Sequence, residues 1–254
     1  MAEFRGRFLW FENLTRDTQA AVAFYTAVVG WTSQRWETEG GPYDMLANGE
    51  VPLAGLHPMP EGAEHPPYWL AYVGTPDVGA TTALAESLGA KVWVRLMEIP
   101  TVGTMSVMQD PQGAMFAAYT PATPPPALPN EASVGEFSWV ELATTDVDAA
   151  LGFYGRLFGW EKQSVHDMGH MGLYIEYGLP GLPLGGLYKK PAEMPGPSSW
   201  LGYVRIADLD AAVGRVKANG GTVLLEPHEV PGGDRIAVFA DPQGSAFALH
   251  QKKG

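Results

Sequence analysis

Hydrophobic and polar positions in the first part of the chain predict one strand, one helix and then three strands. Residues 7–14 alternate between apolar and polar side chains, which indicates a strand. The apolar residues that follow are spaced for one face of a helix, which Asp17 would cap and Gly30 would end. Three short strands are then expected near 31–38, 43–48 and 51–57.

The same order of elements is predicted a second time before residue 120. Residues 69–75 indicate a strand, and Asp77 would cap a helix that ends at Gly89. Residues 110–113 read Asp-Pro-Gln-Gly, which suits a type I turn and predicts a hairpin between the last two strands. The three closing strands are expected near 91–96, 104–109 and 114–119.

The second half of the chain repeats the first half. Trp10 corresponds to Trp139, and after a two-residue insertion Tyr43 corresponds to Tyr174. The register then holds to the second Asp-Pro-Gln-Gly, which indicates a duplication. We therefore predict a first domain at 1–120, a proline-rich linker at 121–131 and a second domain at 132–254.

Composition excludes several classes of function. The 254 residues carry a net charge of −12, which argues against a nucleic-acid partner, and they include no cysteine, which excludes disulfides and thiolate chemistry. No run of 18 apolar residues predicts a membrane helix, and no secretory signal is recognisable. We expect a soluble, cytoplasmic protein with a small-molecule ligand and no membrane partner. Because the two copies can pair within one chain, we expect a monomer or a weak homodimer.

Three motifs give the chain a family resemblance. They are D-x-x-A-A-x-x-F-Y-x-x-x-x-G-W at 17–31, W-x-x-Y-V-x-x-x-D at 69–77 and D-P-Q-G-x-x-F at 110–116. Together they resemble the vicinal oxygen chelate superfamily, which includes glyoxalase I, the bleomycin-resistance proteins and the extradiol dioxygenases. The resemblance implies an α+β fold of tandem domains. Each domain would pair two βαβββ units in a curved, mostly antiparallel sheet around a cavity, with the helices outside.

The resemblance also implies positions for a divalent metal. It places the ligands of the first copy at Trp10, near Leu70 and at Ala117, and those of the second at Trp139, near Leu201 and at Ala248. None of these side chains binds a metal, since such ions take carboxylate or imidazole ligands. We therefore predict no cofactor. A divalent metal remains the alternative. His166 and His170 are four residues apart, a spacing that could bind zinc on a helix, but this segment is expected to be loop and strand.

Seven residues are candidates for the site. Glu12 and Glu141 lie two residues after a tryptophan on a strand, so each would share a face with it and could act as a general acid or base. The residues expected to contact a ligand are Trp10, Trp139, Tyr43, Tyr174 and His250. The structural alternatives are a carboxylate bonded to backbone at a strand end and ordinary edge-strand tyrosines.

The sequence leaves three functions open. The first is a glyoxalase/bleomycin-resistance-like protein that binds a small aromatic or hydrophobic molecule without the usual metal, with or without proton transfer by Glu12 or Glu141. The alternative is a metal-dependent lyase, isomerase or dioxygenase, and the third possibility is an interaction module. A P-loop and a Gly-x-Ser-x-Gly motif are both missing, so phosphoryl transfer and serine hydrolysis are not predicted.

Overall fold

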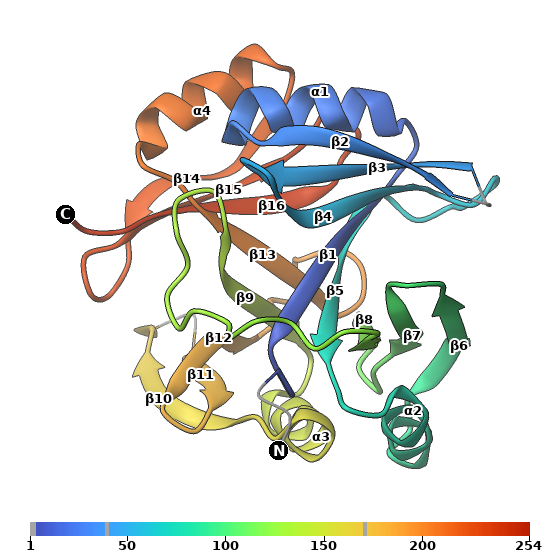
Figure 1. Ribbon diagram of the computed structural model, residues 1–254. Coiled ribbons are helices and arrows are strands. Elements are labelled where there is room, and N and C mark those ends of the chain that lie inside the picture. Colours follow the sequence, from blue (N-terminus) through green and yellow to red (C-terminus); the bar gives the residue numbers. More distant parts are fainter. Residues whose placement is uncertain (1–3, 39–40, 170–171) are drawn as a thin grey trace. The chain divides into compact units, whose positions relative to one another are not determined.

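The computed structural model describes residues 4–38, 41–169 and 172–254 (Figure 1). The predicted order of one strand, one helix and three strands occurs four times. The first repeat comprises β1 (Phe8–Thr15), α1 (Thr18–Val29), β2 (Thr32–Thr38), β3 (Gly41–Asn48) and β4 (Val51–Pro58). The second comprises β5 (Tyr68–Gly74), α2 (Val78–Ser87), β6 (Lys91–Ile99), β7 (Gly103–Gln109) and β8 (Met115–Pro121).

The second half of the chain has the same elements. Its first repeat comprises β9 (Phe137–Thr144), α3 (Val147–Phe158), β10 (Glu161–Asp167), β11 (Leu173–Leu179) and β12 (Leu182–Lys189). Its second comprises β13 (Ser199–Arg205), α4 (Leu209–Ala218), β14 (Thr222–Glu229), β15 (Arg235–Ala240) and β16 (Ala246–Gln251). Among the described residues, no helix has the length and apolarity that a membrane crossing requires.

The strands form two sheets of eight, one from each sequence copy. Their orders are β2-β3-β4-β1-β5-β8-β7-β6 and β10-β11-β12-β9-β13-β16-β15-β14. The first strand of each repeat pairs in parallel with the last, as β1 does with β4, and the hairpin pairs are antiparallel. These mixed, mostly antiparallel sheets confirm the predicted α+β class.

Two compact units divide the chain differently from the two sequence copies. Unit 1 contains residues of 1–9, 71–130 and 139–200, and unit 2 contains 10–70, 131–138 and 201–254. Each unit therefore combines one repeat from the first copy with one from the second. The predicted boundaries at 120 and 132 describe the sequence copies and stay a prediction.

The helices begin where the sequence predicts because aspartates cap them. The side chains of Asp17, Asp77, Asp146 and Asp208 each accept a hydrogen bond from the backbone N–H three residues later. Gly30 ends α1 in the left-handed conformation, with φ of 88°. In unit 2, α1 and α4 lie side by side (Figure 1).

Aromatic side chains dominate both cores. In unit 1, Phe116 makes edge-to-face contacts with Phe153, Tyr154 and Phe158, all of which lie on α3. In unit 2, Phe11 stacks on Phe137 with a ring-centroid distance of 3.6 Å, and Trp69 packs edge-on against the same phenylalanine. Phe11 comes from the first copy and Phe137 from the second, so residues of both copies build this core.

Candidate functional site

In unit 2, the structure brings together three of the predicted site residues. The indole Nε1 of Trp10 donates to the Tyr43 hydroxyl at 3.3 Å, and that hydroxyl donates to Glu12 Oε1 at 2.9 Å. All three side chains are half-buried. We call this set the Trp–Tyr–Glu group of unit 2.

The alternation of β1 decides which face of the sheet carries this group. Phe11 and Asn13 are buried, and the Asn13 amide contacts the hydroxyl of Tyr25 on α1. Trp10 and Glu12 alternate with them, so they project from the face opposite the helix. The face opposite the helix therefore carries an indole and a carboxylate.

A glycine makes room for the tyrosine of the group. Gly55 of β4 is in register with Glu12 of β1. A Cβ atom at Gly55 would lie 1.6 Å from the Tyr43 hydroxyl oxygen. Any other residue at this position would therefore push the tyrosine away from the carboxylate.

Unit 1 contains an equivalent group built from the second copy. Trp139 Nε1 donates to the Tyr174 hydroxyl at 2.8 Å, which donates to Glu141 Oε1 at 2.7 Å. Gly186 takes the place of Gly55, since its Cβ would lie 1.9 Å from the Tyr174 hydroxyl oxygen. The two groups share the same order of donors and acceptors because the duplicated sequence supplies the same four residue types.

Burial fixes the protonation of the tyrosines. Burial, and then the nearby carboxylates Glu12 and Glu141, raise the pKa of Tyr43 and Tyr174 well above the ordinary tyrosine value. Both phenols therefore keep their proton at neutral pH and remain donors to the carboxylates. The pKa of Tyr188, whose ring stacks on Tyr174, is raised by the same two causes.

His250, the seventh candidate, belongs to a different set of contacts. Its Nδ1 lies 2.9 Å from the Ser138 hydroxyl, and its Nε2 lies 2.9 Å from Asp234 Oδ2. These partners come from β9 and from the loop before β15. The sequence offered no motif that links the three residues.

The side chains at the metal positions of the resemblance do not fit a divalent ion. Ala117 and Ala248 are fully buried alanines, and Trp10 presents an indole. In the part of the chain that the structure describes, no three His, Cys, Asp or Glu side chains gather into a group that could hold a metal. His166 contacts Ser164 and Glu176, whereas His170 lies outside the described residues.

Two buried networks that the sequence did not predict connect the copies within each unit. In unit 2 the Tyr25 hydroxyl donates to Asp241 Oδ2 at 3.1 Å, and Trp69 donates to the same hydroxyl. In unit 1 Tyr154 donates to Asp110 Oδ2 at 2.9 Å. The signal was present, because both partners lie in repeated motifs, Phe-Tyr and Asp-Pro-Gln-Gly, but nothing in the sequence pairs one motif with the other.

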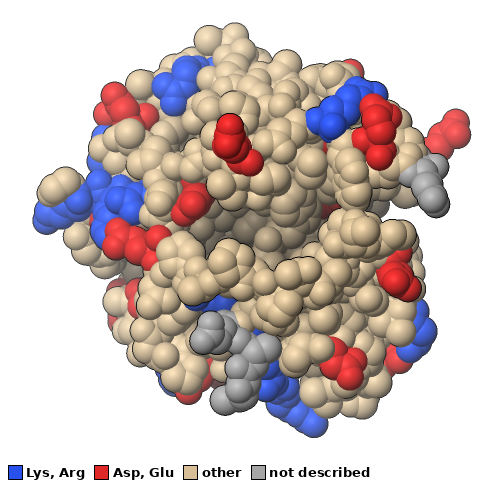
Figure 2. Space-filling model, viewed as in Figure 1, with Lys and Arg blue, Asp and Glu red and all other residues tan. Residues whose placement is uncertain are grey.

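A separate polar cleft of about 570 Å³ lies beside the start of α1 in unit 2. Charged and amide side chains line it, and they pair with one another: Asp44 accepts from Gln19 at 2.6 Å and lies 3.6 Å from Arg35. Its lining includes no residue of the Trp–Tyr–Glu group. On the face drawn in Figure 2, acidic and basic side chains are scattered among uncharged ones.

Relatives of similar length match nearly the whole chain. CFP32 of Mycobacterium tuberculosis, provisionally named a glyoxylase, is 34% identical over 247 residues, which cover 94% of this chain and 92% of that protein. The anthracycline biosynthesis protein DauV of a Streptomyces species is 29% identical over 255 residues, covering 94% and 91% of the two chains.

Solved structures share the fold at low sequence identity. The Mn(II)-bound glyoxalase from Novosphingobium aromaticivorans matches with a TM-score of 0.65 and 17% identity, covering 98% of this chain and 83% of that one. The 2,2',3-trihydroxybiphenyl 1,2-dioxygenase from Sphingomonas wittichii matches with a TM-score of 0.70 and 14% identity, covering 97% and 90%. A family model described as Glyoxalase/Bleomycin resistance protein/Dioxygenase superfamily matches residues 7–118 and 136–249. Because that model matches both copies, the chain belongs to the glyoxalase/bleomycin resistance protein/dioxygenase superfamily.

Proposed function

We propose that this chain binds a small aromatic or hydrophobic molecule at its Trp–Tyr–Glu groups without a bound metal. One observation carries the proposal. Each unit presents an indole, a phenol and a carboxylate, linked by hydrogen bonds, on the sheet face that points away from the helix. Such a set combines a flat apolar surface with one polar anchor, as small-molecule sites do.

The hydrogen bonds explain how the group would recognise a ligand. Trp10 uses its only donor on Tyr43, which fixes the orientation of the indole ring. Tyr43 in turn donates to one carboxylate oxygen of Glu12, which holds that carboxylate in place. A ligand that stacks on the indole and donates an O–H or N–H to Glu12 would lose little side-chain entropy on binding.

The names of relatives support an aromatic ligand. Two relatives from Streptomyces, each 29% identical over most of this chain, are named anthracycline biosynthesis proteins. A planar compound of the anthracycline type would offer both the aromatic surface and the hydroxyl groups that the Trp–Tyr–Glu group could bind. We therefore use such a compound as the first ligand to test.

Binding without a metal is supported by the lack of a suitable donor set among the residues that the structure describes. An octahedral or tetrahedral site needs three or four converging oxygen or nitrogen ligands. The side chains near Glu12 include Tyr43, which keeps its proton, and Tyr68, whose pKa is raised by burial and then by the Glu12 carboxylate. A metal-dependent lyase, isomerase or dioxygenase is the competing function, and its signature would be stoichiometric metal.

A titration with an anthracycline tests the proposal. The fluorescence of the anthracycline should change when it binds. The double variant Glu12→Gln, Glu141→Gln should bind it at least 10-fold more weakly, a loss of about 1.4 kcal/mol in binding free energy. Trp93→Ala is the matched control, since Trp93 is 56% exposed, packs under Lys91 and belongs to neither group. Unchanged affinity in the double variant, or a stoichiometric divalent ion in the purified protein whose removal abolishes binding, would contradict the proposal.

A further inference from the structure

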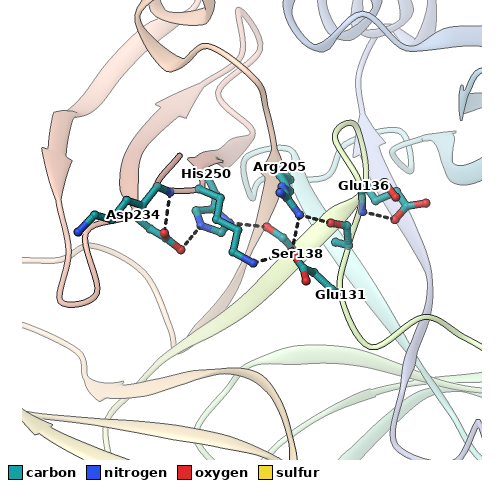
Figure 3. A network of polar contacts seen from close by, with 10 residues as sticks. Glu131, Glu136, Ser138, Arg205, Asp234 and His250 are labelled. Carbon is teal, nitrogen blue, oxygen red and sulfur yellow. Dashed lines mark hydrogen bonds and ion pairs between the residues drawn. The ribbon is translucent and has the colours of Figure 1, made fainter.

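Three residues of unit 2 form a serine–histidine–aspartate chain that the binding proposal does not use (Figure 3). Ser138 lies on β9, His250 lies on β16, and Asp234 comes just before β15. The Ser138 hydroxyl is 2.9 Å from His250 Nδ1, and His250 Nε2 is 2.9 Å from Asp234 Oδ2. All three side chains are half-buried.

The partners of the imidazole define which nitrogen carries the proton. Partial burial of Asp234 favours its neutral form, but hydrogen bonds from the Lys253 backbone N–H and from His250 outweigh this and lower its pKa below the ordinary value. Asp234 is therefore an acceptor, so His250 Nε2 carries a proton. In the neutral form of the ring, Nδ1 is then unprotonated and accepts a hydrogen bond from the Ser138 hydroxyl.

The direction of the serine hydroxyl fits this assignment. Ser138 Oγ also lies 3.3 Å from a second acceptor, the carbonyl oxygen of Tyr203. The contact with His250 is shorter by 0.4 Å. A hydroxyl that donates to a neutral imidazole, which in turn donates to a carboxylate, activates a serine nucleophile; here the roles of the two ring nitrogens are exchanged relative to the serine-protease triad.

A second serine–histidine–carboxylate group in unit 1 shows what the arrangement requires. Ser164 and Glu176 both contact His166 through the same nitrogen, Nε2, at 2.8 and 3.0 Å. The ring of His166 cannot relay a proton from the serine to the carboxylate, because both partners contact the same nitrogen and neither contacts Nδ1 in these bonds. The use of both ring nitrogens therefore distinguishes the His250 group from the His166 group.

The duplication supplies a second comparison. In the register of the repeat, Ser138 and His250 correspond to Leu9 and Tyr119 of the first copy, and Asp234 corresponds to Gly103. The Trp–Tyr–Glu groups and the tyrosine–aspartate pairs occur in both copies, as features of the shared scaffold do. The serine–histidine–aspartate chain occurs in one copy, so the fold does not require it.

We propose that Ser138, His250 and Asp234 form a nucleophile relay that hydrolyses small carboxylic esters. Ser138 Oγ would attack the ester carbonyl carbon while its proton passes to His250 Nδ1. The bond to the leaving alcohol then breaks, and His250 returns that proton to the alcohol oxygen. Water, deprotonated by Nδ1, attacks the acyl-serine, which releases the carboxylic acid and restores the serine hydroxyl.

A cation on the strand next to His250 would act on the oxyanion that this attack creates. Arg205 of β13 is the register partner of His250 on the neighbouring strand, so its side chain leaves the same face of the sheet. Its guanidinium bonds Glu131 at 3.0 Å and the carbonyl oxygen of Ala132 (Figure 3). A fixed positive charge at this place would stabilise the tetrahedral intermediate.

Covalent labelling of the full chain tests the relay. A fluorophosphonate probe should label the wild-type protein, and peptide mass spectrometry should locate the label on Ser138. Hydrolysis of p-nitrophenyl acetate should fall at least 10-fold in Ser138→Ala and in His250→Gln. Ser164→Ala is the matched control, because it removes the hydroxyl of the group that shares one ring nitrogen, and it should leave both readouts unchanged.

The outcomes separate this inference from the binding proposal. The label site is read from the wild-type protein, so it is informative even if a variant fails to fold. No labelling, or labelling at a residue other than Ser138, overturns the relay, as does ester hydrolysis that is equal in Ser138→Ala and wild type. Neither result touches the anthracycline titration, which depends on Glu12 and Glu141.

Discussion

At the scale of single residues, buried aspartate side chains of this protein accept hydrogen bonds from buried tyrosine hydroxyls. Tyr25 and Tyr154 are fully buried, and each donates to an aspartate of an Asp-Pro-Gln-Gly turn. Burial raises the pKa of both phenols well above the ordinary value, with the partner aspartate adding to the shift. The aspartates are also held by backbone N–H groups of their own turns, so each buried carboxylate is satisfied from two sides.

Removing one of these hydroxyls should destabilise the fold. We expect Tyr154→Phe to lower the free energy of unfolding by about 1–3 kcal/mol, because Asp110 Oδ2 loses its buried donor. Urea denaturation followed by circular dichroism measures the change. Tyr119→Phe is the control, since that hydroxyl donates to a carbonyl oxygen in a half-buried position and its loss should cost less. Equal losses would contradict the role given to Asp110.

The burial of Asp110 also predicts how stability depends on pH. Burial raises the pKa of Asp110 in the folded state against the opposing effect of its hydrogen bonds. A raised carboxyl pKa stabilises the folded state below the unfolded value of about 3.9, and this contribution is lost as the pH rises through the higher folded value. Wild type should therefore lose stability relative to Asp110→Asn from about pH 4 upward. Urea denaturation at several pH values measures this difference, and parallel profiles would show that Asp110 titrates normally.

Residues repeated in both copies could be found from the sequence, and unrepeated ones could not. Trp10, Glu12 and Tyr43 attract attention because the second copy has the same residues in the same order. Ser138 and Asp234 carry no such mark, and they lie on segments far apart in the chain. Their contact with His250 depends on which strands are neighbours in the sheet, which local patterns do not specify.

At the scale of elements, the ends of helices were predictable and the outer strands were less so. Aspartate caps and left-handed glycines act within one turn, so they can be read directly from the sequence. β6 (Lys91–Ile99) continues three residues beyond the predicted 91–96. Its outer part is exposed and irregular in register, with bulges against β7, so burial does not impose an alternating pattern there.

Close packing between a tyrosine and a strand glycine predicts a local effect of substitution. Gly186→Ala should displace Tyr174, because the new Cβ would lie 1.9 Å from its hydroxyl oxygen. We expect a loss of about 1–3 kcal/mol in unfolding free energy and weaker ligand binding in unit 1. Denaturation and the ligand titration measure the two effects.

Gly152→Ala is the matched control for that substitution. Gly152 lies inside α3, and its Cβ would meet nothing within 4 Å. Alanine there should stabilise the protein by about 0.5–1 kcal/mol and leave binding unchanged. If Gly186→Ala behaved in the same way, the close approach of Tyr174 to β12 would not constrain the group.

At the scale of the whole molecule, duplication in the sequence does not reveal which faces pack together. The repeat is plain, and it predicted two copies of one fold. Each compact unit, however, combines one repeat from the first copy with one repeat from the second. The stack of Phe11 on Phe137 and the bond from Tyr25 to Asp241 both join one copy to the other within unit 2. A repeated sequence pattern shows which face of each repeat is apolar, but it does not show which other repeat packs against that face.

This exchange predicts how the chain behaves when cut at its linker. A fragment of residues 1–126 would keep Phe11 and Tyr25 but lose Phe137 and Asp241, and the fragment 127–254 would lose Asp110, the partner of Tyr154. Each fragment alone would expose an apolar face and leave buried polar groups unpaired, so we expect aggregation or self-association. Expressed together, with a tag on one fragment, the two should purify as a 1:1 complex with the circular dichroism of the intact chain. Two fragments that are each monomeric and folded would show instead that the copies are independent, and would contradict the division of the chain into units 1 and 2.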